Sequence, residues 1–339
     1  MSNRLTVGIL GTGNMGRQLG LRLLQQPEIE VTAICGTSLA KAQALQNDLQ
    51  AAGTASFDEF DRMLAERPPQ ALFVCIPPFA HAGQVEKAAR QGIHLFLEKP
   101  IAYDLARAEA MVDAIEQSGV VSQVGYHMRF RRSTRRFKQL IESGLAGRPT
   151  LFQGRFWCNF SGLEWWREKS KSNGQVFEQL IHLYDLALHF LGEPASTCGY
   201  MDNLCHRSEA DYTIEDTSLG LVRFRNGSLA SVSGSNCAVP GRFTADYQVV
   251  CANASLEFAS GGNWRTSSQA ILFTHAGGQV QEELFIEDLD LYTEEILTFL
   301  QAVRSGGPSP VPARQGLDGI RLASAVMESA GLGGQPVDL

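Results

Sequence analysis

Residues 5–16, LTVGILGTGNMG, join a short apolar strand pattern to a glycine-rich loop, and a helical pattern of leucines follows. The three glycines have the Gly-x-Gly-x-x-Gly spacing. The first permits a tight turn, the second lets a pyrophosphate approach the backbone, and the third allows close packing of helix on strand. Amides at the helix N-terminus supply further anion-binding donors, so this stretch predicts a dinucleotide-binding fold. The loop supplies the candidate cofactor-binding residues Gly11, Thr12, Gly13, Asn14, Met15 and Gly16.

The end of the second strand, expected at residues 30–35, bears on the choice of cofactor. A carboxylate that binds the ribose hydroxyls of NAD is expected there, about 20 residues after the glycines. The sequence instead reads Gly36-Thr37-Ser38, with Lys41 one turn into the next helix. Two hydroxyls and a lysine suit a ribose 2′-phosphate, which favours NADP over NAD. Alternatively, Ser38 only caps the helix 39–51 and Lys41 is solvated.

Helical and strand patterns alternate through the rest of residues 1–125. Helices expected at 57–66, 81–91 and 104–117 separate strands expected at 71–76, 93–97 and 120–125. This alternation predicts an α/β fold with a parallel, doubly wound sheet. Pro77 closes one strand and His81 follows the proline turn, so both are candidate cofactor contacts. His81 is equally compatible with a purely structural role.

Residues 93–100, IHLFLEKP, place a glutamate and a lysine at the end of a strand. Pro100 ends the strand and biases Lys99 toward an extended backbone. In an open α/β sheet, ligands bind at the carboxyl edge of the strands, where Lys99 can do proton or electrostatic work. Glu98 contacts ribose or nicotinamide in this interpretation, or only braces the turn. The alternative for both residues is a solvated charge pair at a strand end.

The second half of the chain is rich in strand patterns. Strands are expected at 151–159, 245–250, 254–259, 270–275 and 279–286, and Asn226-Gly227 between apolar runs predicts a hairpin. Helices are expected at 291–304 and 315–330. We therefore predict a second domain, 126–339, with a large, mostly antiparallel open sheet that forms a dimer surface. The closing helix, 315–330, is a candidate to pack back on the first domain.

One segment of the second half, residues 174–185, carries a carboxylate and an imidazole at helical spacing. On a helix, Glu178 and His182 are i,i+4 neighbours on one face, and Asp185 follows at i+3. A carboxylate beside an imidazole can orient it and hold its protonated form, which suits general acid–base catalysis. The alternatives are surface hydrogen bonding and zinc binding. No third protein ligand has matching spacing, so no metal site is predicted.

Aromatic and charged residues near these segments are candidates for contact with a substrate. They are His127, Arg129, Trp165, Trp166 and Asp185. The two tryptophans offer an apolar wall or a sugar-stacking face, or else they pack in the core. The set suits neutral polyols and anionic sugars alike.

Composition excludes several other classes of protein. The net charge of −7 argues against general binding of nucleic acid or anionic membranes. The seven cysteines are scattered without zinc-ligand or redox spacing, which predicts reduced, mostly buried thiols in a cytoplasmic protein. No apolar run is long enough to span a bilayer, and the N-terminus shows no apolar signal-peptide region.

Taken together, these motifs resemble the glucose–fructose oxidoreductase, inositol dehydrogenase and rhizopine-catabolism family (Gfo/Idh/MocA). The resemblance rests on the glycine loop, the Pro77-Pro78 turn with His81, Glu98-Lys99-Pro100, residues 174–185, and Glu215-Asp216-Thr217 with the following hairpin. It implies an N-terminal Rossmann domain and a C-terminal α/β domain whose sheet mediates homodimers or homotetramers. It also implies hydride transfer between NAD(P) and a hydroxyl or carbonyl, usually on a sugar, cyclitol or related polyol.

The resemblance also implies roles for individual residues. Lys99 corresponds to the family's catalytic lysine and His182 to its acid–base histidine, whereas Glu178 falls where many members carry aspartate. Our hypothesis is that His182 exchanges a proton with the reacting oxygen while Lys99 stabilises the developing alkoxide. Two alternatives stay open: a non-catalytic, dinucleotide-sensing regulatory protein, and an enzyme that uses tightly bound NAD for transient redox.

Overall fold

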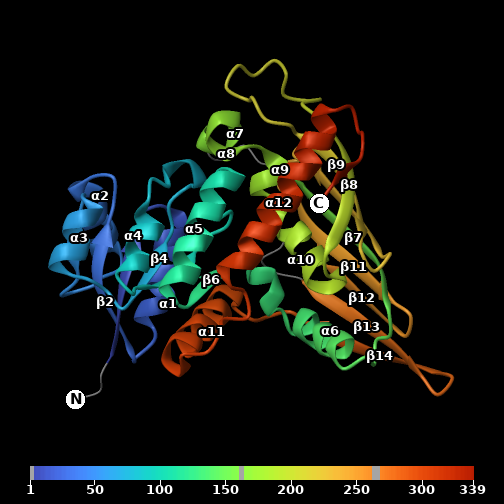
Figure 1. Ribbon diagram of the computed structural model, residues 1–339, viewed down its shortest axis with the longest axis horizontal. Helices are drawn as coiled ribbons and strands as arrows, with labels where there is room; N and C mark the ends of the chain where they lie inside the picture. Colours follow the sequence, from blue (N-terminus) through green and yellow to red (C-terminus); the bar gives the residue numbers. More distant parts are fainter. Residues whose placement is uncertain (1–3, 160–163, 262–267) are drawn as a thin grey trace. The chain divides into compact units, whose positions relative to one another are not determined.

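The computed structural model describes residues 4–159, 164–261 and 268–339, which form two compact units (Figure 1). The first unit runs to His127 and also includes Asp290–Leu317. The second contains Met128–Leu289 and Asp318–Leu339. The sequence placed residues 290–317 in the second domain, whereas the structure places them in the first unit.

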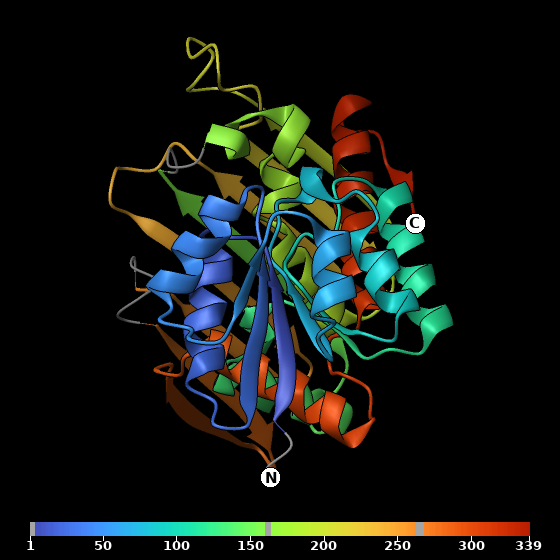
Figure 2. The same cartoon turned by 90° about the vertical axis from the view of Figure 1, so that its left-hand side faces the viewer.

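The first unit is built on a parallel sheet with helices on both faces (Figure 2). Its strands are β1 Leu5–Leu10, β2 Ile29–Cys35, β3 Ala55–Phe57, β4 Ala71–Val74, β5 His94–Leu97 and β6 Ser122–Val124. Its helices are α1 Asn14–Leu24, α2 Leu39–Asp48, α3 Phe60–Glu66, the 3₁₀ turn η1 Pro78–Ala80, α4 Gln84–Arg90, α5 Leu105–Ser118 and α11 Leu291–Ser305. The strand order is β3-β2-β1-β4-β5-β6, and every neighbouring pair is parallel. The doubly wound prediction is confirmed, and the order reverses between β1 and β4, the switch point where such sheets bind ligands.

Helix α11 belongs to the first unit because its apolar face packs into that unit's core. Phe73 and Phe96, on adjacent strands, stack with ring centroids 4.8 Å apart, and Phe299 of α11 meets both rings edge-on. The side-chain amide of Gln123 also donates to the carbonyl of Glu295, at 2.6 Å. Helical periodicity shows that residues 291–305 have an apolar face, but not which sheet that face covers.

The second unit is built on one large sheet. Its strands are β7 Pro149–Cys158, β8 Pro194–Asp202, β9 Thr217–Phe224, β10 Leu229–Ser235, β11 Phe243–Cys251, β12 Ala254–Ala259, β13 Gln269–Ala276, β14 Gln279–Ile286 and β15 Val337–Asp338. The order is β14-β13-β12-β11-β7-β10-β9-β8-β15, and among the described strands only β7 and β10 pair in parallel. The predicted mostly antiparallel sheet is confirmed. Strands β8 and β15 were not predicted, because β8 lacks an alternating apolar pattern and β15 has only two residues.

The helical segments of the remaining chain range from single turns to the long closing helix. They are η2 His127–Phe130, α6 Arg132–Glu142, α7 Glu164–Arg167, α8 Lys169–Ser172, α9 Gln175–Glu178, α10 Ile181–Leu191 and α12 Ala313–Gly331. Helix α12 starts in the first unit, where Gly316 lies against Ile101 and Val124. From Asp318 it belongs to the second unit. In the part of the chain that the structure describes, no helix is long and apolar enough to cross a membrane.

The two faces of the large sheet differ in what covers them. Helices α10 and α12 pack on one face, where glycines make room for them: an added Cβ at Gly154 would touch Leu183, and one at Gly199 would lie 2.9 Å from Val326. The opposite face exposes apolar side chains such as Leu219 and Leu221 of β9. The alternation along β9 therefore produces one covered face and one open face.

Candidate active site

The glycine loop follows β1 at the switch point of the first sheet. Gly11 has a φ of +111°, and a Cβ there would lie 2.5 Å from the carbonyl oxygen of Cys75. A Cβ at Gly16 would collide with the carbonyl oxygen of Gly11. These two positions therefore require glycine for the turn and for the close approach of helix α1 to β1.

Gly13 has a different environment, which fits a bound pyrophosphate. It is exposed, and no atom of the described residues lies within 4 Å of where its Cβ would be. Gly13 is the N-cap of α1, and no described side chain caps that helix end. The amides of the first turn thus face open space that a phosphate group can enter.

The end of β2 lies beside this loop, since a Cβ at Gly36 would be 2.8 Å from the methyl group of Thr12. Ser38 caps α2 by accepting a hydrogen bond from the amide of Lys41 at 3.3 Å. The Lys41 ammonium donates to the hydroxyl of Thr37 at 3.2 Å. The capping role predicted as an alternative for Ser38 is therefore present, and Lys41 and Thr37 form an exposed polar group next to the loop.

After β4, the chain forms the proline turn and brings His81 into the interior of the first unit. Its side chain is buried, and its Nδ1 has no hydrogen-bond partner among the described residues. Burial and, secondarily, the positive charge of Arg107 lower the pKa of His81 to about 4. His81 is therefore neutral at neutral pH. Pro77 and the exposed Phe79 flank the buried Pro78 in this turn.

The end of β5 carries Glu98 and Lys99, both half-buried. The Lys99 amide donates to the Glu98 carboxylate at 3.3 Å, and the Lys99–Pro100 peptide bond is cis. A Cβ at Gly125 would lie 3.3 Å from Glu98 Oε1, so this carboxylate rests against the backbone that follows β6. Glu98 thus braces the strand end that presents Lys99.

Glu295 of α11 is a buried acid that the sequence analysis missed. It has no exposed surface, and neither carboxylate oxygen has a hydrogen-bond partner among the described residues. Burial, and next the negative charge of Glu98, hold the pKa of Glu295 well above its usual range. Burial therefore favours the protonated form of Glu295, which limits the negative charge beside Glu98. The sequence does contain a signal for this buried acid: Glu295 lies one helical turn before Phe299, on the apolar face of the helix.

In the second unit, Glu178 and His182 do not share one continuous helix, and that structural prediction is wrong. Glu178 is the last residue of α9, and α10 begins at Ile181. Between them the Leu180 amide bonds to the carbonyl of Gln175 at 3.0 Å, so the regular i,i+4 ladder is interrupted. A Glu178 carboxylate oxygen accepts a hydrogen bond from the indole of Trp166. His182 lies in the first turn of α10 and is buried.

Arg129 and Asp185, both predicted as substrate contacts, bind each other. The guanidinium is bidentate on the carboxylate, with Nε 2.8 Å from Oδ2 and Nη2 bonded to Oδ1. Both side chains are buried. The pair therefore ties α10, one turn after His182, to the turn η2. This ion pair joins Arg129 to the helix that carries His182, and it offers both residues a structural role in place of substrate contact.

The segment that leads into α9 is held by Glu215. Its Oε1 accepts the amide of Val176 at 2.9 Å, and its Oε2 accepts the ammonium of Lys169 at 3.2 Å. A Cβ at Gly174, whose φ is +107°, would lie 2.5 Å from this carboxylate. The glycine therefore lets the carboxylate reach the start of the helix, a role for Glu215 that its sequence context does not reveal.

The remaining predicted substrate residues have neighbours in the structure. Trp166 is buried in a cluster with Tyr212 and Ile214, and Trp165 packs against that cluster while staying half-buried. Core packing, which was the alternative for the tryptophans, therefore accounts for Trp166. The half-buried His127 ring lies 5.2 Å from the ring of Tyr292.

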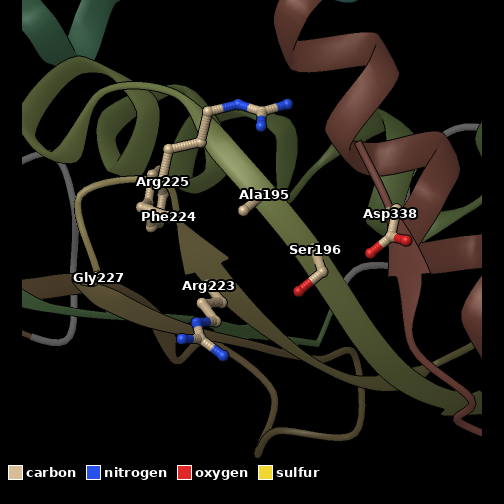
Figure 3. Close-up of a pocket in the computed structure, with 7 residues that line it drawn as sticks. All are labelled: Ala195, Ser196, Arg223, Phe224, Arg225, Gly227 and Asp338. Carbon is tan, nitrogen blue, oxygen red and sulfur yellow. The ribbon is translucent and has the colours of Figure 1, made fainter.

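A polar hollow of about 380 Å³ occurs elsewhere in the second unit (Figure 3). It lies at β8, β9 and β15, and its lining residues are Ala195, Ser196, Arg223, Phe224, Arg225, Gly227 and Asp338. None of these seven residues is a predicted site residue. The candidate site therefore stays at the carboxyl edge of the first sheet.

The strand order, the switch point and the open glycine loop define a dinucleotide-binding protein of the Rossmann class. Residues 5–126 match the oxidoreductase family with an NAD-binding Rossmann fold, and residues 134–257 match the GFO/IDH/MocA C-terminal domain. The chain belongs to the Gfo/Idh/MocA oxidoreductase family and is an NAD(P)-dependent oxidoreductase. The resemblance found in its motifs is thereby confirmed.

Curated relatives match over nearly the whole chain. The uncharacterized oxidoreductase YrbE of Bacillus subtilis is 25% identical to this chain, and the match covers 100% of this chain and 98% of the relative. D-xylose 1-dehydrogenase (NADP(+)) 2 of Haloferax volcanii is 25% identical, with 96% of this chain and 97% of the relative covered. Myo-inositol 2-dehydrogenase of Thermotoga maritima is 24% identical, with 96% of each covered.

Solved structures share the fold at low sequence identity. Levoglucosan dehydrogenase in complex with NADH and levoglucosan superimposes with a TM-score of 0.88 at 19% identity, covering 99% of each chain. An NAD-binding oxidoreductase from Klebsiella pneumoniae superimposes with a TM-score of 0.87 at 18% identity, also covering 99% of each.

Proposed function

We propose that this enzyme transfers a hydride between NADP and a hydroxyl or carbonyl group of a sugar, cyclitol or related polyol. The observation that carries the proposal is the open approach to Gly13 at the switch point of the sheet whose strand β5 is followed directly by Glu98 and Lys99. The curated names of two full-length relatives, a xylose dehydrogenase and a myo-inositol dehydrogenase, support this substrate class.

The chain's own residues divide the work as follows. When bound, the nicotinamide cofactor supplies or accepts the hydride. Lys99 stabilises the negative charge that develops on the reacting oxygen, and His182 exchanges a proton with that oxygen. Glu98 braces the backbone of Lys99, as its hydrogen bond to the Lys99 amide indicates. Glu178 supports His182 indirectly, because its carboxylate ties α9 to Trp166.

The cofactor contacts follow from the position of each group in the first unit. The glycine loop holds the pyrophosphate, and Pro77 and His81 border the cofactor from the turn after β4. We assign the ribose 2′-phosphate to Thr37, Ser38 and Lys41, because an exposed ammonium and two hydroxyls gather at the end of β2. This assignment makes NADP the preferred cofactor. His127 and Trp165 stay candidates for contact with the substrate.

The open face of the large sheet is proposed as the contact between subunits of a homodimer or homotetramer. Leu219, Leu221 and Leu229 lie on neighbouring strands and are each about half exposed, with relative accessibilities of 46%, 48% and 53%. Tyr200 and Trp157 are also exposed, at 64% and 40%. Exposed apolar patches of this kind mark association surfaces. Sedimentation equilibrium of the wild type and of Leu221→Lys tests the proposal, and a monomeric wild type would contradict it.

The experiment that tests the function has two stages. Fluorescence titration with NADPH and NADH measures the two dissociation constants, and we expect the lower one for NADPH. A turnover screen with sugars, cyclitols and keto-sugars then identifies the substrate class. Net oxidation or reduction of the cofactor supports a dehydrogenase and excludes transient redox on a tightly bound cofactor. Cofactor binding without turnover across the panel would favour the dinucleotide-sensing alternative.

A further inference from the structure

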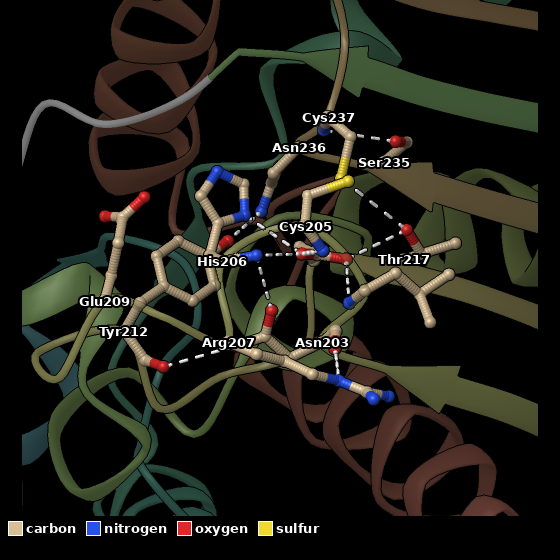
Figure 4. Close-up of polar contacts among 12 residues, drawn as sticks. Asn203, Cys205, His206, Arg207, Glu209, Tyr212, Thr217, Ser235, Asn236 and Cys237 are labelled. Carbon is tan, nitrogen blue, oxygen red and sulfur yellow. Dashed lines mark hydrogen bonds and ion pairs between the residues drawn. The ribbon is translucent and has the colours of Figure 1, made fainter.

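A second chemically distinctive cluster lies in the second unit, between the loop 203–216 and the hairpin β9–β10 (Figure 4). The sulfur atoms of Cys205 and Cys237 and a carboxylate oxygen of Asp216 all lie within 4.8 Å of one another. Strand pairing creates the cluster, because Thr217 of β9 is opposite Ser235 of β10. This register brings Asp216, which precedes Thr217, close to Cys237, which comes two residues after Ser235. The loop 203–216 contributes Cys205.

The Asp216 carboxylate is fully buried and organises the loop around it. Its Oδ1 accepts the amide of Leu204 at 2.9 Å and the hydroxyl of Thr217 at 3.0 Å. Its Oδ2 accepts the amides of Cys205 and His206 at 2.7 and 3.2 Å, and His206 Nδ1 lies 2.9 Å from it. Burial raises the pKa of Asp216, but these hydrogen bonds, led by the Leu204 amide, lower it to about 2. The carboxylate is therefore ionised at neutral pH.

The two thiols share this negative environment. Cys205 is exposed and Cys237 is half-buried, so the cluster is accessible from solvent. The Thr217 hydroxyl, which donates to Asp216 Oδ1, also lies 3.9 Å from the Cys237 sulfur. The charge of a cation bound here would stabilise thiolates beside the carboxylate.

The donor set indicates which cation fits. Two sulfur donors select a thiophilic ion, and zinc combines thiolates with a carboxylate oxygen in tetrahedral sites. Magnesium and calcium require an all-oxygen shell, which this cluster does not offer. His206 holds the carboxylate through Nδ1, an arrangement typical of the groups that orient metal ligands from behind.

We propose that Cys205, Cys237 and Asp216 bind one zinc ion, with solvent completing its coordination and His206 orienting the carboxylate. The ion replaces the Thr217 hydroxyl on Asp216 Oδ1, where it now donates at 3.0 Å, and this hydroxyl rotates to donate to solvent instead. Binding replaces the two thiol protons: each sulfur forms a bond to zinc, each proton passes to solvent or buffer, and no electron is transferred. The ion links the loop 203–216 to the segment that follows β10. The same loop ends in Glu215, which holds the start of α9, so the site stabilises the segment that precedes His182.

Sequence spacing does not reveal this site. Its ligands come from three segments of the chain, and Cys205 and Cys237 lack the short Cys-x-x-Cys spacing of zinc ribbons and redox motifs. The expectation that no cysteine pair binds metal therefore rested on local spacing. The pairing of β9 with β10 brings the residues together.

Metal titration of the full-length protein tests the proposal. The protein is stripped of metal with a chelator, kept reduced with a phosphine, and titrated with Zn²⁺ in competition with a chromophoric chelator. Co²⁺ serves as the spectroscopic probe, because thiolate ligation produces charge-transfer absorption. We expect uptake of one ion per chain and thiolate–cobalt absorption in the wild type.

Three variants make the test specific. Cys205→Ser and Cys237→Ser should each weaken zinc binding by about 100-fold or more, and His206→Gln by about 10- to 100-fold, the range for outer-shell partners. Cys198→Ser, in β8 and outside the cluster, is the matched control and should bind zinc as the wild type does. Because Cys205 is exposed, its replacement should leave the fold intact, which circular dichroism verifies.

Three outcomes would overturn the assignment. One is a reduced wild type that takes up no zinc. Another is uptake that is unchanged in both Cys205→Ser and Cys237→Ser. The third is a Cys205–Cys237 disulfide in the protein isolated without reductant, which would assign the pair to thiol oxidation instead.

Discussion

Replacement of Gly13 by alanine separates cofactor binding from folding more cleanly than any other change in the glycine loop. The Gly13 backbone has φ −78° and ψ −169°, an extended conformation that alanine adopts without strain. No atom of the described residues lies within 4 Å of the added methyl group. We therefore expect the free energy of unfolding to change by less than about 0.5 kcal/mol.

The same methyl group occupies the space through which a pyrophosphate approaches the loop. If it displaces the phosphate far enough to lose one charge-assisted hydrogen bond, the cost is about 1.5–3 kcal/mol. That cost corresponds to a dissociation constant for NADPH that is about 10- to 100-fold higher. Fluorescence titration measures the constant, and urea unfolding measures the stability.

Gly331→Ala is the matched control, because this glycine also has open space around its Cβ position but lies at the end of α12. It should leave the affinity for NADPH unchanged. Unaltered NADPH binding in Gly13→Ala would refute the placement of the pyrophosphate. A large loss of stability in Gly13→Ala would refute the inference that its side-chain position is open.

Further predictions concern stability and cofactor choice. Because the pKa of His81 is lower in the folded state (about 4) than in the unfolded state (about 6.5), the unfolded state binds more protons between these values. Stability should therefore fall by up to about 3 kcal/mol as the pH drops from 7 to 4, and His81→Gln should flatten this dependence in urea unfolding at several pH values. Asp185→Asn, which leaves the buried Arg129 guanidinium without its anion, should destabilise the fold by about 3–5 kcal/mol, and the double variant Arg129→Met/Asp185→Leu by less. Equal losses in the single and double variants would contradict that account. Lys41→Ala should raise the dissociation constant for NADPH by about tenfold and leave that for NADH unchanged, which parallel titrations can measure.

The first unit was largely predictable because its signals are local. The glycine spacing, the alternation of helix and strand patterns and the Glu98-Lys99-Pro100 strand end each occupy a short stretch of sequence. Strand β3 was missed because it has only three residues. The placement of α11 was missed for a different reason: an apolar helix face is visible in the sequence, but its partner is more than 170 residues away.

Within the candidate site, the sequence indicated which residues are chemically notable, but it did not indicate which of them contact one another. Glu178 and His182 are four residues apart whether or not the helix is continuous. The sequence therefore does not reveal that the helix is interrupted at Leu180. Arg129 and Asp185 were both assigned to substrate, because a sequence does not show that two distant charges neutralise each other.

The central claim is hydride transfer with Lys99 and His182 acting on the reacting oxygen, and label transfer tests it most directly. The reduced cofactor carries deuterium at the transferable nicotinamide position, and single turnover is followed with the carbonyl substrate found in the screen. We expect the wild type to move one deuterium to the product for each cofactor oxidised. Lys99→Met and His182→Asn should bind the cofactor with unchanged affinity but transfer the label about 10²–10⁴-fold more slowly. Transfer at the wild-type rate in either variant, or product without deuterium, would contradict it.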